Sequence, residues 1–261
     1  MQQLYTEVCS EQNQPINPFI AEILSQTEEQ ELYTSTLKLC GNNRLVQVQR
    51  VSDEDFLVLA QVLSKNSFIT SRFCIISQIA CRNFQNNSSV LCLNIMGNEI
   101  GTDGSEHITK ALHRNTTLLS LRMTGNKIGN KGGMLFASML QINSTLEELD
   151  LGDCDLGIQS LIALATVLLQ NKTLKSLNLN RPIFYVMQED TTVHLSEMLR
   201  VNSTLQELHL SKHEITDFGV QRLCDALHEN HTLKYLNLSC NKITRDGVKY
   251  LAEVLKINKT L

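Results

Sequence analysis

The chain has 261 residues, of which 42% are hydrophobic and 5% aromatic, with no tryptophan, and its formal net charge at pH 7 is −4. This balance excludes a basic field over the whole protein, so direct nucleic-acid binding is not expected. The length and apolar content suffice for a substantial core, and we expect a single repeat domain with an N-terminal cap.

The N-terminus has neither a basic start nor an apolar run, so we expect no secretory signal. No run of about 18 apolar residues occurs, so we expect no membrane span. Cytoplasm, nucleus or both are the expected locations. The eight cysteines form no CxxC pair, and Cys154 and Cys224 fall in repeat positions, which favours buried free thiols over disulfides or a metal site.

Residues 1–33 lie outside any repeat and are predicted to form a capping segment. Its helix would occupy 18–32, with Asn17 as N-cap and Pro18 at the first helical position. We then expect a strand at 37–39 with Asn42 in the following turn, and a helix at about 53–63. The segment 67–87 is shorter than a repeat and lacks its pattern, which predicts irregular chain.

The stretch 146–174 is the clearest repeat unit. Leu146, Leu149 and Leu151 predict a short strand entering a turn, and 161–170 predicts a buried helix. One such unit cannot bury both its apolar faces, so it needs copies on either side. Copies follow a 28-residue period, with one step of 31 residues; their strands are centred on Leu93, Leu121, Leu149, Leu177, Leu208 and Leu236.

Each repeat helix is followed by an asparagine that starts an Asn-x-Thr-Leu sequence. A recurrence in phase with the repeat favours a structural role over glycosylation, and we expect the asparagine to end the helix in the left-handed conformation. The six are Asn115, Asn143, Asn171, Asn202, Asn230 and Asn258.

A second recurring position follows each strand and is called the turn slot here. An asparagine amide in this slot can bond backbone groups of the adjacent turn. The slot holds Asn98, Asn126, Cys154, Pro182, His213 and Asn241. Thr216 and Thr244 are predicted N-caps, and a recurring glycine is predicted where a side chain would crowd the neighbouring turn; these are Gly104, Gly132, Gly219 and Gly247.

The 28-residue period, the LxxLxLxxN core and the NxTL helix ends resemble the ribonuclease-inhibitor-like class of leucine-rich repeats over 34–261. The resemblance implies an α/β solenoid shaped as a horseshoe, with parallel strands on the concave face, helices on the convex face, and protein binding instead of catalysis. Segments that the repeat does not dictate, such as LRMTGNKI at 121–128 and LDLGDCDLG at 149–157, are similar to one member that continues through further repeats. A C-terminally shortened form, with its last repeat cut at 261, is therefore expected.

Motifs for catalysis or metal binding do not emerge from the sequence. The glycines of GNKIGNKGG at 125–133 lack the spacing of a phosphate-binding loop. His209 and His213 lie on a strand running into a turn, with no third ligand nearby. We expect no enzyme activity, no metal and no cofactor.

The concave face is the predicted binding surface, because strand alternation identifies its exposed side chains. One row reads Cys92, Ser120, Glu148, Ser176, Glu207 and Tyr235, and the other reads Asn94, Arg122, Asp150, Asn178, His209 and Asn237. Its centre is acidic, and we expect either an ordinary solvated surface or a docking site for a basic segment of a partner protein. The candidate contacts are Arg122, Glu147, Glu148, Asp150, Asp153, Glu207, His209 and Tyr235.

The 31-residue repeat, 174–204, adds a loop that is a second candidate contact through Arg181, Phe184 and Tyr185. Three functions stay open from the sequence. The leading one is a non-catalytic scaffold that binds a protein; the others are an occluding inhibitor of an enzyme, such as a ribonuclease, and a structural subunit of a large assembly.

Overall fold

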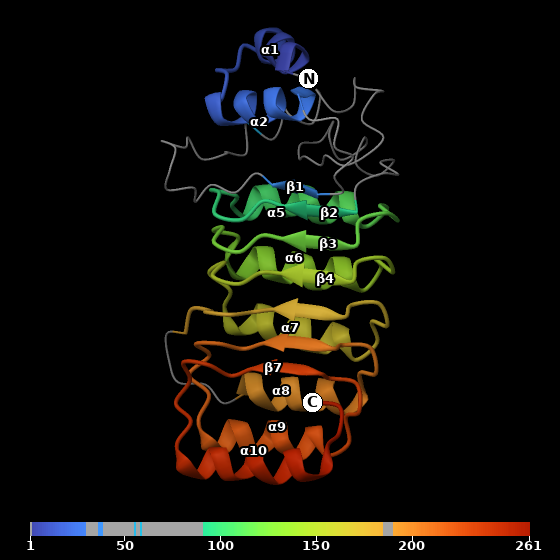
Figure 1. Cartoon of the computed structure of the whole chain (residues 1–261), viewed down its shortest axis with the longest axis vertical. Coiled ribbons are helices and arrows are strands. Elements are labelled where there is room, and N and C mark those ends of the chain that lie inside the picture. Colours follow the sequence, from blue (N-terminus) through green and yellow to red (C-terminus); the bar gives the residue numbers. More distant parts are fainter. Residues whose placement is uncertain (1, 30–35, 39–54, 56–57, 59–90, 185–189) are drawn as a thin grey trace.

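A computed structural model of the chain describes residues 2–29, 36–38, 55, 58, 91–184 and 190–261. The predictions for Asn42, for the irregular segment 67–87 and for most of the helix at 53–63 lie outside these residues, as does Tyr185. Figure 1 shows the described part as a stack of layers, with the strands along one side and the helices behind them.

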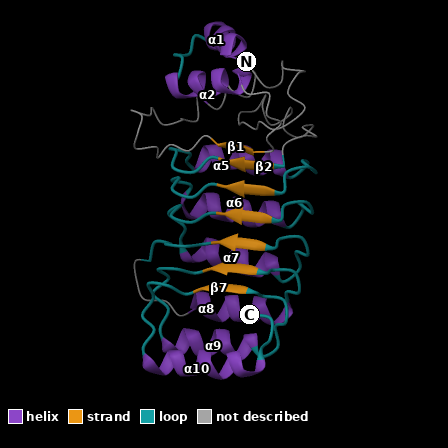
Figure 2. Ribbon diagram, viewed as in Figure 1, coloured by secondary structure: helices purple, strands orange, loops and turns teal. Residues whose placement is uncertain are grey.

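The elements alternate between strand and helix once per repeat (Figure 2). The strands are β1 (Thr36–Lys38), β2 (Cys92–Asn94), β3 (Ser120–Arg122), β4 (Glu148–Asp150), β5 (Ser176–Asn178), β6 (Glu207–His209) and β7 (Tyr235–Asn237). The helices are α1 (Gln2–Glu11), α2 (Pro18–Glu29), α5 (Thr102–Leu112), α6 (Gly129–Leu140), α7 (Ile158–Leu168), α8 (Asp190–Val201), α9 (Asp217–Leu227) and α10 (Arg245–Ile257).

The described strands form one parallel sheet in chain order, β1 to β7. From β2 to β7, neighbouring strands pair with the repeat step as their offset, so that Leu149 lies between Leu121 and Leu177. Between β1 and β2 the offset is two such steps, with Leu37 paired to Leu93. The predicted strand positions and both predicted rows of the concave face are thereby confirmed. The fold is the predicted α/β leucine-rich repeat solenoid.

The core runs continuously between sheet and helices. Leu146, Leu149 and Leu151 are fully buried and meet buried helix residues such as Leu161 and Leu164. The helix α7 begins three residues before the predicted start at 161 and ends two before 170. The apolar periodicity marks only the buried stripe of the helix, whereas the helix itself begins after Gly157, whose backbone is extended.

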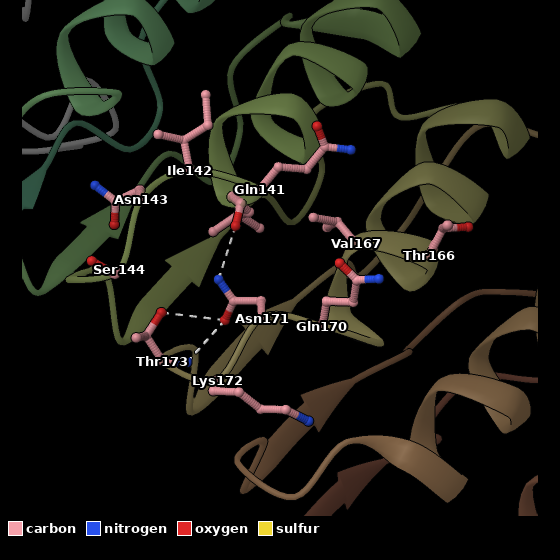
Figure 3. Close-up of a pocket in the computed structure, with 11 residues that line it drawn as sticks. Gln141, Ile142, Asn143, Ser144, Thr166, Val167, Gln170, Asn171, Lys172 and Thr173 are labelled. Carbon is pink, nitrogen blue, oxygen red and sulfur yellow. Dashed lines mark hydrogen bonds between the residues drawn. The ribbon is translucent and has the colours of Figure 1, made fainter.

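The asparagines at the helix ends are buried and link consecutive repeats. The Asn171 amide donates to the Leu140 carbonyl at 3.0 Å, while its side-chain oxygen accepts from the backbone of Thr173 (Figure 3). The same oxygen also accepts from the backbone of Leu174. Equivalent donations to the preceding repeat come from Asn143, Asn202, Asn230 and Asn258. This is a ladder of side-chain bonds along one edge, which we call the helix-end ladder.

The predicted left-handed conformation of these asparagines is wrong. None of the six has a positive φ, and Asn258 has φ −69° and ψ 125°. The left-handed residues recur instead just before the turn slot, at Gly97, Gly125, Asp153, Arg181, Lys212 and Cys240. Asparagine is used at the helix end because its amide both donates and accepts, not because of its backbone freedom.

The turn slot forms a second ladder, as predicted. Asn126 donates to the Ile95 carbonyl at 3.0 Å, and Asn241 donates to the Leu210 carbonyl at 2.9 Å. Cys154 and His213 make the same connection, to the Met123 and Leu179 carbonyls. Burial raises the pKa of the Cys154 thiol to about 12, so it remains a protonated donor.

Three of the recurring glycines, Gly132, Gly219 and Gly247, lie where a side chain would crowd its neighbours, as predicted. A Cβ on Gly132 would lie 2.9 Å from the Ile128 Cβ and 3.1 Å from the Ser105 Oγ. Thr244 is the N-cap of α10, and its hydroxyl accepts from the Asp246 backbone at 3.4 Å. Thr216 occupies the N-cap position of α9.

The N-terminal segment contains two helices where one was predicted. Asn17 caps α2, accepting from the Phe19 backbone at 3.1 Å, which confirms the predicted helix start. The helix α1 was missed, although its buried residues Tyr5, Val8 and Cys9 have helical spacing.

Candidate functional site

The concave face brings the candidate residues together in the centre of the sheet. Glu148 and Asp150 lie on β4, and Glu207 and His209 lie on β6, with β5 between them. Arg122 lies beside Asp150 on β3, and Tyr235 lies beside Glu207 on β7. The parallel register thus makes neighbours of positions that are 28 or 31 residues apart in the sequence.

Three of the acidic candidates are paired with cations from neighbouring repeats. The Arg122 Nε lies 2.7 Å from the Glu148 Oε1, and the Lys175 Nζ lies 2.7 Å from the Glu147 Oε1. Arg181 pairs with Asp153 at 2.9 Å, in the turns beyond the strands. The bond to Glu148 raises the pKa of Arg122, because it favours the charged guanidinium.

The other two carboxylates of the centre have neutral donors. Asp150 accepts from the Thr124 hydroxyl and from the Gly152 backbone at 3.0 Å. Glu207 accepts from the Ser176 hydroxyl at 3.0 Å. In the described part of the chain, neither forms an ion pair with a lysine or arginine within 4.0 Å.

An aromatic pair borders these carboxylates. The His209 and Tyr235 rings are 5.0 Å apart between centroids and are tilted by 41°. Tyr235 is 49% exposed, so a face or edge of its ring is open to a partner. Such exposed aromatic surface is a common source of binding energy at protein interfaces.

The second candidate surface, the loop of the 31-residue repeat, is partly committed to the fold. Phe184 packs against the core and meets the His213 ring edge-on, with centroids 6.0 Å apart. Arg181 is occupied by Asp153. Both described members of this candidate set, Arg181 and Phe184, therefore make contacts within the chain.

A depression of about 290 Å³ lies in the concave face above β5. We call it the β5 depression. It contains most of the acidic centre together with the neighbouring polar side chains: its lining is Arg122, Glu148, Leu149, Asp150, Ser176, Asn178, Glu207 and His209.

A larger hollow of about 590 Å³ lies at the edge that carries the helix-end ladder, where α6 and α7 end (Figure 3). Its lining includes Ile142, which is 63% exposed, and Val167, with Gln141, Gln170 and Lys172 around them. The repeat pattern of the sequence does not predict this hollow. The exposed apolar residue immediately before Asn143 is the signal that was available in the sequence.

The described cysteines are all free, in agreement with the prediction of free thiols. Cys9, Cys154 and Cys224 are buried as predicted, but Cys240 is exposed, because it lies in a turn at the surface. Within the described residues, no group of three or more potential metal ligands comes together. The same part of the chain contains no helix long and apolar enough to span a membrane.

Comparison with protein families agrees with this geometry. The model of the leucine-rich repeat family matches five segments, 86–106, 114–137, 143–165, 201–224 and 229–252. Each of them runs from the region of a strand into a repeat helix.

Comparison with curated proteins finds leucine-rich repeat-containing protein 34 from Homo sapiens, 52% identical over 238 residues, which cover 87% of this chain and 51% of the relative. The Mus musculus protein of the same name is 53% identical over 49 residues, 19% of this chain and 12% of the relative. This chain therefore spans about half the length of the human relative it matches.

Among solved structures, a chain described as Leiomodin-1 actin-binding site 2 has a TM-score of 0.42 and 18% identity, covering 68% of this chain and 86% of that chain. A likeness of this degree carries no conclusion about partners.

Proposed function

Because this chain is a leucine-rich repeat protein, we propose that it is a non-catalytic scaffold that binds another protein through the concave face of its solenoid. The observation that supports the proposal most directly is the register of the sheet. It aligns polar side chains of six consecutive strands into one face, while the leucines between them are directed into the core.

The centre of that face favours a basic partner segment. The paired carboxylates Glu147 and Glu148 contribute little net field, since each has a cation within 3 Å. Asp150 and Glu207 are instead bonded to neutral hydroxyl donors, Thr124 and Ser176. Complementary charge at an interface raises the association rate and selects the partner, more than it raises affinity.

The test is capture of partners by the wild-type chain and by the double variant Glu148→Lys, Asp150→Lys. A matched control, Glu197→Lys with Glu229→Lys, makes the same change of charge on the helical side, where both residues are exposed. We expect the concave variant to lose partners that the wild type and the control retain. Wild-type binding should weaken as the salt concentration passes 0.1 M, where the screening length is about 10 Å.

Melting curves serve as the folding control, because Glu148→Lys also removes the bonds from Arg122 and Ser120. Surface substitutions usually change stability by about 0.5 kcal/mol, and a lost exposed ion pair adds at most about 1 kcal/mol. An unchanged set of partners for the folded concave variant, with binding independent of salt, would contradict the proposal.

A further inference from the structure

The shape of the β5 depression follows from the side chains on three adjacent strands. The two outward residues of β5, Ser176 and Asn178, are short, whereas β4 and β6 carry glutamates at the paired position. Parallel strands are about 4.8 Å apart, so the two walls stand about 10 Å from each other. That width admits one extended side chain from a partner.

The charge inside the depression is not balanced by its own residues. It contains three carboxylates, Glu148, Asp150 and Glu207, against one guanidinium, Arg122. Arg122 and Ser120 both bond to Glu148, which draws that carboxylate toward β3 and away from β5. Two formal negative charges are left, on Asp150 and Glu207.

Glu207 is held over β5 by its bond from Ser176. This bond fixes the position of the carboxylate but does not neutralise it. Asp150 is likewise fixed by two neutral donors. Carboxylates that are already oriented lose less side-chain entropy when they bind a cation.

One end of the depression is bounded by a flat aromatic surface. His209 lines the depression and is packed against the half-exposed Tyr235. A planar cation can stack on such a surface while its edge bonds to carboxylates. Guanidinium is planar and offers several fixed donors, whereas an ammonium is a compact point charge.

We propose that the β5 depression binds a single arginine side chain from the partner protein, with its guanidinium bonded to Asp150 and Glu207 and its plane against the His209 and Tyr235 pair. This rests on the proposed function and names the chemistry that the concave face recognises. Arg122 is bonded to Glu148 and not to Asp150 or Glu207, although the charge of Asp150 also attracts it.

The probe is the peptide acetyl-Gly-Arg-Gly-amide, titrated into the full chain and followed by backbone amide NMR shifts. Two matched peptides carry citrulline, which keeps the shape of arginine without its charge, or lysine. We expect the arginine peptide to shift the amides of 148–150, 176–178 and 207–209. The citrulline peptide should leave them unchanged, and the lysine peptide should bind more weakly, by about threefold or more.

The variants Asp150→Asn and Glu207→Gln keep the shape and the acceptor oxygen of each side chain. Each should weaken binding of the arginine peptide by about fivefold or more. The matched control is Glu147→Gln, since Glu147 lies next to β4 in the chain, is not among the residues that line the depression, and is paired with Lys175; the affinity of this variant should stay within about twofold of wild type. Equal binding of the citrulline or lysine peptide, or equal affinity of all three variants, would overturn the proposal.

The two proposals fail separately. If Glu148→Lys with Asp150→Lys abolishes partner capture but Asp150→Asn and Glu207→Gln do not weaken the arginine peptide, the concave face still binds and the arginine site is refuted. If the arginine peptide binds as described but the concave variant still captures the same partners, the depression binds arginine, and the proposal that partners dock on the concave face is refuted.

Discussion

The two edges of the solenoid differ in the residue types whose side chains link consecutive repeats. At the helix-end ladder, every repeat from 115 to 258 uses asparagine. At the turn slot, asparagine shares the position with Cys154, Pro182 and His213. Both edges connect a side-chain donor to a carbonyl of the preceding repeat.

The difference lies in the bonds that the different residue types at a position have in common. Asparagines at both edges donate and accept, since in the turn slot Asn126 accepts from the Ile100 backbone and Asn241 from the His213 and Ile215 backbones. Asn171 bonds a carbonyl of the preceding repeat and two amides of its own turn, which needs a donor and an acceptor on one short side chain. The bond that the turn slots share is a single donation, which a thiol or an imidazole can also make. Because only this one donation is common to the turn slots, the position accepts several residue types. The longer repeat also has its extra residues next to this position.

Pro182 marks the limit of that tolerance. Its side chain carries no donor, so the connection that Cys154 makes to the preceding repeat has no counterpart at 182. Nearby groups link these repeats instead: Arg181 pairs with Asp153, and the Ile183 backbone donates to the Leu156 carbonyl at 2.8 Å.

The largest expected effect comes from the core that both edges enclose. Leu149→Asp should unfold the array, because it places a charge at a fully buried position where even Leu→Ala costs about 2–5 kcal/mol. Thermal melting measures this, with Asp150→Asn as a control on the opposite face of the same strand. A wild-type melting curve for Leu149→Asp would refute the register.

The same substitution at both edges tests the comparison itself. Asn171→Cys should lower the free energy of unfolding by about 3 kcal/mol, since it leaves buried backbone groups without partners. Asn126→Cys should cost less, about 2 kcal/mol, because a thiol can keep the donation that Cys154 makes in the next repeat and only one backbone amide, that of Ile100, loses its acceptor, against two at Asn171. Urea denaturation gives both values, and equal costs would mean that the two edges do not differ in this way.

His213 predicts a pH dependence at the turn edge. Burial lowers its pKa from 6.5 to about 4, so the unfolded chain takes up the proton first as the pH falls. The contribution of neutral His213 to stability is complete above pH 6.5 and is lost as the pH falls from 6.5 to 4. At pH 5 the loss amounts to about 2 kcal/mol. His213→Asn should remove this part of the acid sensitivity, as measured by the difference between the unfolding free energies of variant and wild type across pH. Parallel curves would contradict the assignment.

The smallest expected effect is none at all. Asn143 begins an Asn-x-Thr sequence, but its amide is buried and donates to the Leu112 carbonyl at 2.7 Å. The protein expressed in mammalian cells should therefore show the same electrophoretic mobility before and after glycosidase treatment. A shift that disappears in Asn143→Gln would show that this amide is accessible.

The sequence by itself determined the solenoid, the order of the strands and the two rows of the concave face. A fixed period places equivalent residues side by side, so one correctly assigned strand assigns them all. The sequence also identified the helix-end asparagines as structural, but the predicted reason, a left-handed backbone conformation, was wrong. Backbone preference is a property of the single residue, whereas their bonds run to carbonyls of the preceding repeat.

Only the tertiary structure decided how the charges of the concave face are distributed. The sequence places Glu147, Glu148, Asp150 and Glu207 on one surface, but it cannot give the direction in which each side chain leans. In the fold, Glu147 and Glu148 find cations in adjacent repeats, while Asp150 and Glu207 receive only neutral donors. Side-chain direction depends on rotamers chosen among neighbours from three strands, and that choice exists only once the strands have been brought together.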